Sequence, residues 1–313
     1  MPQGSQDAAS NDVEMLTHSG FVAVIGRPNV GKSTLMNRIL GEKIAIVSPK
    51  PQTTRLRQLG IYSQPDIQAI FVDTPGIHQP RHKLGEFMVT VAVNALRDAD
   101  VILFVVDMSQ KPNEEDQRVS ALLREAKTSS PVVLALNKID RLSPEQIEPR
   151  VETYRALAPD ADWSTLSATL GKGVDDVLKR VIAQLPAGPQ FFPDDQLSDT
   201  ALRDIVGEIV REKVLLNTEQ EVPHSVAVEV QEFKERSATM TYIGAMIYVE
   251  RDSQKGILIG KHGAMLKKIS SEARADIETL VGTQVYLELW VKVLKNWRHD
   301  ENMLRRLGYK LGK

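Results

Sequence analysis

One stretch of the chain reads Gly26-Arg27-Pro28-Asn29-Val30-Gly31-Lys32-Ser33, directly after the apolar run Phe21 to Ile25 and directly before Thr34 to Leu40. A buried strand, a glycine-bounded turn and a helix make a setting in which backbone N–H groups converge on an anion. In that setting Lys32 supplies a cation and the Ser33 hydroxyl is placed to bind Mg²⁺. A chance glycine turn is the alternative. The pattern therefore predicts a phosphate-binding loop made of Gly26, Arg27, Pro28, Asn29, Val30, Gly31, Lys32, Ser33 and Thr34.

Length and composition limit the number of domains and the kinds of site that this chain can contain. A chain of 313 residues, 42% of them hydrophobic and 26% charged, suggests about two globular domains. The net charge of −2 gives no overall attraction to nucleic acid, so any such attraction must be local. With no cysteine, disulfides, thiolate metal sites and cysteine nucleophiles are excluded, which fits a cytoplasmic location. Residues 1–19 are polar and lack an apolar leader segment, so we expect a disordered tail there.

After the loop, apolar runs alternate with amphipathic stretches. The runs are Ile67 to Val72, Val101 to Val106 and Val132 to Leu136. Strands alternating with helices predict an α/β fold with a mostly parallel sheet covered on both faces. Ligands of such sheets bind beyond the carboxyl ends of the strands, so those ends are where a site is expected.

The first of these ends carries Asp73-Thr74-Pro75-Gly76. An aspartate there can hold Mg²⁺, and the Gly76 amide can approach a γ-phosphate because no side chain blocks it. An ordinary strand-ending turn is the alternative when the motif stands alone. Next to a phosphate loop, it favours a nucleotide site.

A later strand end carries Asn137-Lys138-Ile139-Asp140. Guanine offers a carboxylate two donors on one edge, N1–H and the exocyclic amino group, whereas adenine offers neither. A buried Asp140 would be left unpaired against adenine, so the prediction is GTP or GDP. A helix N-cap is the alternative. Further on, Ser167, Ala168 and Thr169 could present backbone amides to the guanine O6.

These motifs, in this order, resemble the translation-factor-like GTPase superfamily over residues 20–187. The resemblance implies a GTPase whose first switch closes on Mg²⁺ through a threonine. The segment Ser48 to Arg55 lies in the corresponding interval, and Thr54 is the first choice, with Thr53 in reserve. The expected metal ligands are then Ser33, Thr54 and Asp73, and the expected catalytic residues are Lys32, Asn29, Thr54 and Gly76.

The catalytic glutamine of Ras-like enzymes is replaced here by Ile77, which can neither donate nor accept a hydrogen bond. We therefore expect slow intrinsic hydrolysis. Asn29 resembles the asparagine that helps hold K⁺ in potassium-activated GTPases, and Arg55 or Arg57 is the competing source of positive charge. Residues 77–98 are interpreted as the second switch and its helix, with His78 and His82 as exposed loop residues.

A proline-rich stretch then predicts a linker over residues 188–198. Beyond it the pattern is helix, two strands, a helix around Gly260-Lys261-His262-Gly263, a third strand and a helix. Residues 199–313 resemble a type II KH domain, of α+β class, in which a G-x-x-G loop approaches the backbone of single-stranded RNA. A helix–turn–helix without a ligand is the alternative. From Lys255 to Lys313 there are twelve Lys and Arg against six Asp and Glu, so positive charge gathers there. Lys267, Lys268 and Arg274 could contact phosphates or simply form a solvated helix face.

A GTPase domain joined to a KH domain resembles the Era family of bacterial GTPases. The resemblance implies GTP-gated binding to the 3′ end of 16S ribosomal RNA and to the 30S subunit, peripheral contact with the membrane in some members, and a monomer. In this interpretation the two domains reorient about residues 186–198 when the switches become ordered. The alternative is a regulatory GTP-binding switch whose second domain binds a protein or membrane partner.

Overall fold

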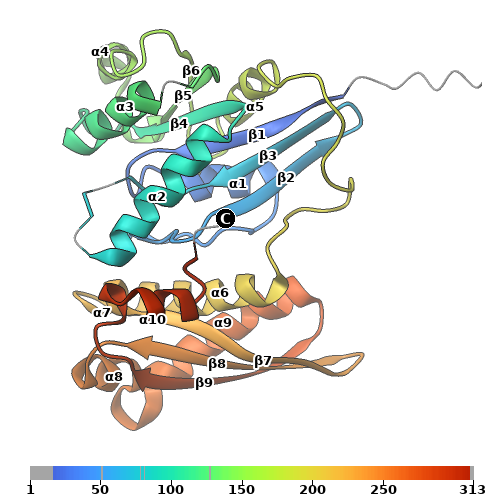
Figure 1. The fold of residues 1–313 in the computed structure, drawn as a ribbon, viewed down its shortest axis with the longest axis vertical. Coiled ribbons are helices and arrows are strands. Elements are labelled where there is room, and N and C mark those ends of the chain that lie inside the picture. Colours follow the sequence, from blue (N-terminus) through green and yellow to red (C-terminus); the bar gives the residue numbers. More distant parts are fainter. Residues whose placement is uncertain (1–16, 51, 78, 81, 127, 311–313) are drawn as a thin grey trace, which may run out of the picture.

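The computed structural model describes residues 17–50, 52–77, 79–80, 82–126 and 128–310. The expected tail falls almost entirely outside the described residues, as does His78. Two domains are stacked on one another, with the KH domain below the first domain in Figure 1.

The first domain contains a six-stranded sheet in the order β2-β3-β1-β4-β5-β6. Only β2 runs antiparallel to its neighbour; the other pairings are parallel, which confirms the predicted fold class. The strands are β1 (His18–Ile25), β2 (Gln58–Gln64), β3 (Ile67–Asp73), β4 (Val101–Asp107), β5 (Val132–Asn137) and β6 (Asp162–Thr165). The helices are α1 (Lys32–Leu40), α2 (Lys83–Arg97), α3 (Glu114–Ala126), α4 (Pro144–Arg155) and α5 (Val174–Ile182), with a 3₁₀ turn η1 (Ile139–Arg141).

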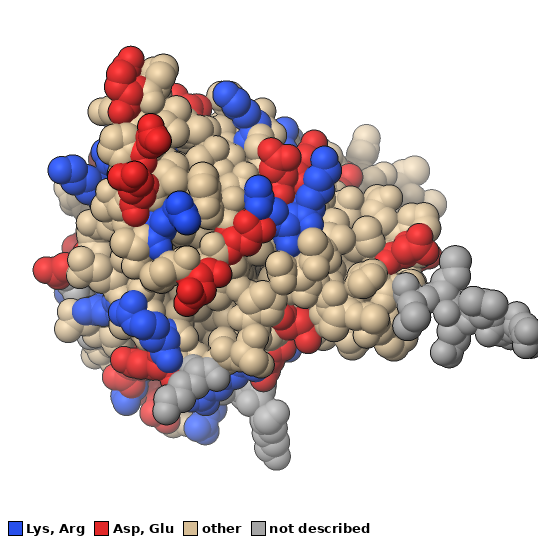
Figure 2. All heavy atoms as spheres, turned by 90° about the horizontal axis from the view of Figure 1, so that it is seen from above, with Lys and Arg blue, Asp and Glu red and all other residues tan. Residues whose placement is uncertain are grey.

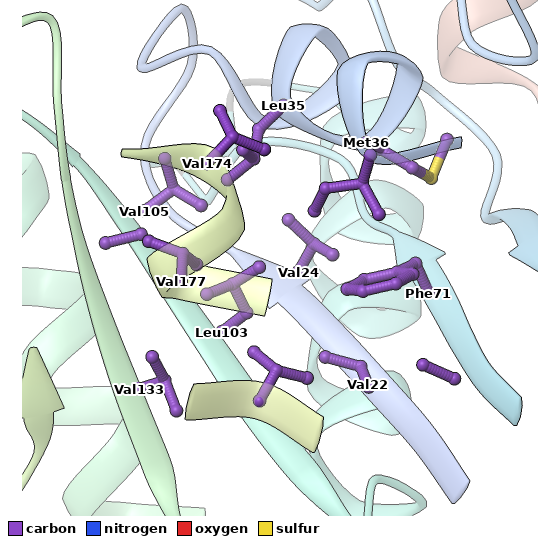
Figure 3. Close-up of a cluster of buried hydrophobic side chains, with 14 of the residues drawn as sticks. Val22, Val24, Leu35, Met36, Phe71, Leu103, Val105, Val133, Val174 and Val177 are labelled. Atoms are coloured by element: carbon purple, nitrogen blue, oxygen red, sulfur yellow. The ribbon is translucent and has the colours of Figure 1, made fainter. Parts of the chain in front are cut away.

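Side chains of β1 alternate between two cores, as the period of two in a strand requires. Val22 and Val24 pack with residues of α1 and α5, and Figure 3 shows Leu35, Met36, Val174 and Val177 meeting the sheet on this face. Ala23 and Ile25 face the opposite side, where α2, α3 and α4 cover the sheet. Because both faces of the sheet are buried, a ligand is expected at the carboxyl ends of the strands.

The KH domain has a three-stranded sheet in the order β7-β8-β9, with β7 antiparallel and β9 parallel to β8. Its helices α6 and α10 lie on the side that faces the first domain (Figure 1). The elements are α6 (Leu202–Asn217), α7 (Val222–Ser225), β7 (Ala227–Ser237), β8 (Met240–Val249), α8 (Asp252–Ile259), η2 (Lys261–Gly263), α9 (Ala264–Val281), β9 (Gln284–Val293), η3 (Trp297–His299) and α10 (Glu301–Arg306). This order confirms the type II KH arrangement.

The expected hinge over residues 186–198 differs from what the structure contains. The Ser19 amide donates to Pro186 O at 3.0 Å, and Gln68 bonds the backbone of both Phe191 and Phe192. Near the end of the segment, the Ile61 amide donates to Leu197 O at 2.9 Å. The connection is irregular, as its prolines require, but side chains and backbone of the first domain tie it to the sheet along most of its length. In this structure the segment up to Leu197 is therefore held by the first domain.

Candidate nucleotide site and RNA-binding loop

The phosphate loop runs from the end of β1 to the start of α1, as expected. Lys32 is only 6% exposed, and its ammonium donates to Gly26 O at 3.2 Å and Arg27 O at 3.1 Å. Burial lowers the Lys32 pKa to about 8 from 10.5, with Asp73 opposing the shift. Gly31 has φ of 103°, and a Cβ there would lie 2.3 Å from the Asn137 side-chain nitrogen. The loop thus holds a cation at the centre of a tightly fixed backbone.

The three expected metal ligands converge. The Ser33 hydroxyl donates to Asp73 Oδ2 at 2.6 Å, and the Thr54 hydroxyl lies 3.1 Å from both Ser33 Oγ and Asp73 Oδ2. Asp73 is fully buried, which raises its pKa, and its Oδ1 has no hydrogen-bond partner among the described residues. Thr53 instead donates to Lys50 O at 2.7 Å. Hydroxyl and carboxylate oxygens around an unpartnered buried carboxylate oxygen suit Mg²⁺, with Thr54 rather than Thr53 beside it.

The first switch lies over the phosphate loop. One cavity is lined by both segments: Pro28, Asn29, Gly31, Lys32, Ser33 and Thr34 of the loop and Ile46, Val47, Ser48, Gln52, Thr53 and Thr54 of the connection between α1 and β2, together with Gly76. The Asn29 side chain donates to Pro49 O at 2.8 Å and so links the two segments. Gly76 packs against Pro28, where a Cβ would be 2.7 Å from the proline nitrogen. The cavity is therefore lined by the phosphate loop together with Thr54 and Gly76, the residues expected to meet Mg²⁺ and the γ-phosphate.

The side chains of some predicted ligand residues have structural roles. Val30 is fully buried, and the Thr74 hydroxyl donates to Val24 O at 2.7 Å. The Arg27 guanidinium is directed to Asp116, 3.2 Å away, and not toward the cavity. Pro75 is buried next to Thr74. These side chains shape the loop, so any contact that they make with a ligand has to come from their backbone.

The guanine motif is only partly as expected. Asn137 connects three segments, because its amide donates to Val30 O at 2.8 Å and its Oδ1 accepts from Ala168 N at 3.0 Å. The Asp140 carboxylate is exposed on η1, and its contact with the guanine base stays a prediction. The Ser167 amide donates to Lys172 O at 2.8 Å, so it and the Ala168 amide have partners within the protein. Thr169 is bonded through its carbonyl, which accepts from Arg38 at 2.6 Å. The role of this segment at O6 stays a prediction.

An ion-pair network behind the site was missed from the sequence. Asp107, the last residue of β4, accepts from Lys138 at 2.7 Å and lies 3.7 Å from Arg27, which also pairs with the buried Asp116. Lys138 further donates to Asn29 O at 2.7 Å. Burial alone would raise the pKa of Asp107. The hydrogen bonds from Lys138 and Ser109, with the positive charge of Lys138, outweigh that effect and lower the pKa. The available signal was the position of Asp107 at the carboxyl end of a parallel strand, the same signal that singled out Asp73.

Neither arginine proposed as a catalytic charge lies at the phosphate loop. Arg55 is 1% exposed, and its guanidinium donates to the carbonyls of Val226 and His224 in the KH domain, at 2.5 and 3.2 Å. Arg57 is exposed next to β2, where it lines a hollow with α6 and the segment after α10. Ile77 is fully buried in the core, so it cannot orient water. His82, expected to be an exposed loop residue, caps α2 by accepting from the Gly85 amide at 3.0 Å.

The G-x-x-G loop lies on the outer surface of the KH domain. Gly260 and Gly263 have φ of 71° and 78°, and Lys261 and His262 between them are exposed. A hollow next to the loop runs between α9 and the edge strand β9 and is lined by Gly263, Leu266, Lys267, Ser270, Ser271, Arg274, Tyr286, Leu287, Glu288 and Leu289. Lys268 does not line this hollow and pairs with Glu272 at 3.8 Å. Figure 2 views the molecule from above, at the end formed by the first domain, and shows acidic and basic side chains mixed over that surface. The excess of basic residues found in the sequence after Lys255 does not extend to this end.

Comparisons with known proteins support both the nucleotide-binding domain and the KH domain. A family model described as a 50S ribosome-binding GTPase matches residues 21–138, and a KH-domain model matches residues 221–298. GTPase Era of Geobacter metallireducens is 52% identical over 292 residues, which cover 93% of this chain and 97% of that protein. The chain belongs to the Era family of GTPases.

Solved structures of Era are also similar over nearly the whole chain. One is Era in complex with MgGDPNP and nucleotides 1506–1542 of 16S ribosomal RNA; it is 40% identical, with a TM-score of 0.90 over 94% of this chain and all of that one. A variant of Aquifex aeolicus Era bound to GDP·AlF₄⁻ gives the same identity, TM-score and coverage. Era-family architecture thus accounts for both domains. Among the described residues, no helix combines the length and apolar character needed to cross a membrane.

Proposed function

We propose that this chain binds and hydrolyses GTP with Mg²⁺, and that its KH domain binds the 3′ end of 16S ribosomal RNA during assembly of the 30S subunit. The observation that carries the proposal is the likeness to an Era structure containing both MgGDPNP and that RNA. The convergence of Ser33, Thr54 and Asp73 provides matching chemistry in this chain. Domain limits of 20–187 for the GTPase, 188–198 for the linker and 199–313 for the KH domain fit this division of labour.

In the nucleotide site, backbone amides of the phosphate loop and the Lys32 ammonium would bind the β- and γ-phosphates. Ser33, Thr54 and Asp73 would hold Mg²⁺, which neutralises charge developing on the phosphate oxygens. The Gly76 amide would face the γ-phosphate, and Asp140 would accept the two guanine donors, with Asn137 and Lys138 holding its loop against the phosphate loop. Binding of the base would cover the exposed carboxylate and so supply the discrimination against adenine.

Hydrolysis is proposed to be slow on its own and assisted by K⁺ near Asn29. Support comes from the burial of Ile77, from the engagement of Arg55 in the KH domain, and from the Asn29 contact with Pro49 O, which puts an amide and a backbone carbonyl at one side of the phosphate cavity. Turnover in KCl should exceed turnover in NaCl of equal ionic strength by about 100-fold, the low end of what one preorganised charge-stabilising group contributes. Equal rates in the two salts would exclude K⁺ assistance, and Asn29→Ala should bring the KCl rate down to the NaCl rate.

On the KH domain, Gly260, Lys261, His262 and Gly263 would approach the RNA backbone, and the hollow beside them would take unstacked bases against Tyr286, which is 57% exposed. Lys267 and Arg274 line this hollow and are the better candidates for phosphate contacts, whereas Lys268 has an acidic partner. We further propose that the chain works as a monomer in the cytoplasm, with any contact with the inner membrane being peripheral.

The test is binding of the full chain to an RNA with the sequence of the 16S 3′ end, measured by fluorescence anisotropy with Mg²⁺ and either GDPNP or GDP. We expect a higher affinity in one nucleotide state and a loss of about 10-fold or more in the double variant Gly260→Asp, Gly263→Asp, since two carboxylates would repel the phosphates. Unchanged RNA affinity in that variant would contradict the RNA role of the loop. It would favour a regulatory GTP-binding switch whose second domain binds a protein or membrane partner.

A further inference from the structure

We propose that the KH domain acts as an internal clamp on the first switch, and that Arg211 and Glu212 of α6 thereby determine how strongly the chain prefers GTP to GDP. The proposal rests on the proposed function, because it requires GTP and Mg²⁺ to bind at the phosphate loop. Both residues are positioning residues: they contact neither the cavity nor its lining side chains directly, but hold the backbone of the connection between α1 and β2 (residues 41–57).

Glu212 holds the first arm of this connection. One carboxylate oxygen accepts from the Val47 amide at 2.8 Å, and the other accepts from the Lys43 ammonium at 2.6 Å. Glu212 is 2% exposed, so these bonds form away from water. Lys43 also pairs with Asp276 of α9 at 2.8 Å, which links the same arm to the helix that follows the G-x-x-G loop.

Arg211 holds the second arm. Its guanidinium donates to the carbonyls of Gln52, at 3.3 Å, and of Thr53, and it is oriented from behind by Glu208 at 2.8 Å. With 1% of its surface exposed, Arg211 makes these contacts in a buried environment. The carbonyl of Thr53 belongs to the peptide that precedes Thr54, so Arg211 fixes the position of the proposed metal ligand.

Arg55 completes the arrangement from the opposite direction. While Arg211 reaches from the KH domain to the switch, Arg55 reaches from the switch to the carbonyls of Val226, His224 and Pro223, the last at 3.4 Å. Thr54 therefore lies between two residues anchored to the second domain, and the 3.1 Å distances that join it to Ser33 and Asp73 depend on that anchoring. A switch released from the KH domain would lose these constraints together.

The consequence for ligand choice follows from linkage. A clamp that binds only the closed switch strengthens the ligand that requires closure, and that ligand in turn strengthens the clamp by the same factor. GTP places a γ-phosphate where the closed switch meets the phosphate loop, whereas GDP does not. Buried hydrogen bonds to charged groups contribute roughly 10- to 100-fold in an equilibrium, so removing Arg211 should reduce GTP affinity by that order and leave GDP nearly unaffected.

The experiment compares Arg211→Ala with Arg203→Ala in the full chain. Arg203 lies on the same helix and also donates to a backbone carbonyl, that of Val230 at 2.7 Å, but within its own domain. Affinities for fluorescent GDPNP and GDP are measured with Mg²⁺ after thermal unfolding has shown that each variant is folded. We expect Arg211→Ala to weaken GDPNP by about 10-fold or more and GDP by less than about 2-fold. Arg203→Ala should change neither.

Glu212→Gln is the second variant, and it is decisive if Arg211→Ala does not fold. The amide keeps an acceptor for the Val47 amide but loses the charge that pairs with Lys43, so GDPNP alone should weaken, by roughly 3-fold. A folded Arg211→Ala with the wild-type ratio of GDPNP to GDP affinity would overturn the clamp, as would equal weakening of both nucleotides by either variant. Failure of the wild-type chain to bind GDPNP would instead overturn the proposed function on which the clamp depends.

Discussion

The Gly26–Ser33 loop and the Gly260–Gly263 loop both lead into the N-terminus of a helix, but one is enclosed and the other is open. In the first, a Cβ on Gly31 would lie 2.3 Å from Asn137. In the second, a Cβ on Gly260 would meet only Met265 of the helix that follows, at 2.8 Å, and nothing lies within 4 Å of where a Cβ on Gly263 would be. The cation of the first loop, Lys32, is buried, while Lys261 of the second is exposed. An enclosed loop suits a compact phosphate group that must be held for chemistry, and an open one suits a polymer that has to enter and leave along a surface.

The largest expected effect separates the two glycines that flank α1. Gly31→Ala forces a side chain into Asn137 at a positive φ, so we expect a loss of about 2–4 kcal/mol in unfolding free energy and of more than about 100-fold in GDPNP affinity. Gly41 ends the same helix with φ of 74° and open space around it, so Gly41→Ala should cost only the strain of a left-handed residue, about 1–2 kcal/mol. Urea denaturation and nucleotide titration measure both. Equal effects in the two variants would contradict the claim that close packing defines the first loop.

Asp140→Asn tests whether the exposed carboxylate selects the base. The amide keeps one acceptor oxygen but turns the other into a donor that opposes a guanine N–H, so GTP affinity should fall by roughly 100-fold. Xanthine carries a carbonyl where guanine has the amino group, so XTP should bind better to the variant than to the wild type. Competition titrations with GTP, XTP and ATP measure this, and an unchanged preference for GTP would show that Asp140 does not contact the base.

A smaller effect should distinguish two neighbouring lysines on α9, the helix that follows the Gly260–Gly263 loop. Lys267 lines the hollow and Lys268 pairs with Glu272, so Lys267→Ala should weaken RNA binding about 5-fold and Lys268→Ala less than about 2-fold. The salt dependence of RNA affinity should become shallower by about one unit of slope only for Lys267→Ala. Matching losses in the two variants would mean that the whole helix face, and not the hollow, attracts the RNA.

The smallest expected signal comes from the buried cation. The Lys32 pKa of about 8 lies below its usual 10.5, so the free site loses its proton as pH rises through 8, and bound phosphates should raise the pKa again. Nucleotide binding should therefore take up a substantial fraction of a proton at pH 8.5 and almost none at pH 7. Calorimetry in two buffers of different ionisation enthalpy detects that fraction. Zero uptake at both values would mean that Lys32 remains charged in the free protein.

Motifs at the ends of strands could be predicted because each combines a local sequence pattern with one rule of sheet topology. Ser33 and Asp73 belong to such motifs, whereas Thr54 is predicted from the resemblance to the GTPase superfamily, and the fold brings the three side-chain oxygens within 3.1 Å of one another. Asp107 was missed because a lone carboxylate at a strand end has no motif around it. The contacts of Arg55 could not be found, since its partner Val226 lies 171 residues away and only the docking of two domains joins them.

The most direct test of coupling between the bound nucleotide and the KH domain is a measurement of the distance between the two domains. Because the native chain has no cysteine, Glu152→Cys on α4 and Thr279→Cys on α9, both exposed, allow spin labels to be placed on the two domains without other changes. With GDPNP and Mg²⁺, pulsed electron paramagnetic resonance should give one narrow distance distribution, and with GDP a broader one extending to longer distances. The same narrow distribution in both nucleotide states would contradict coupling through the first switch.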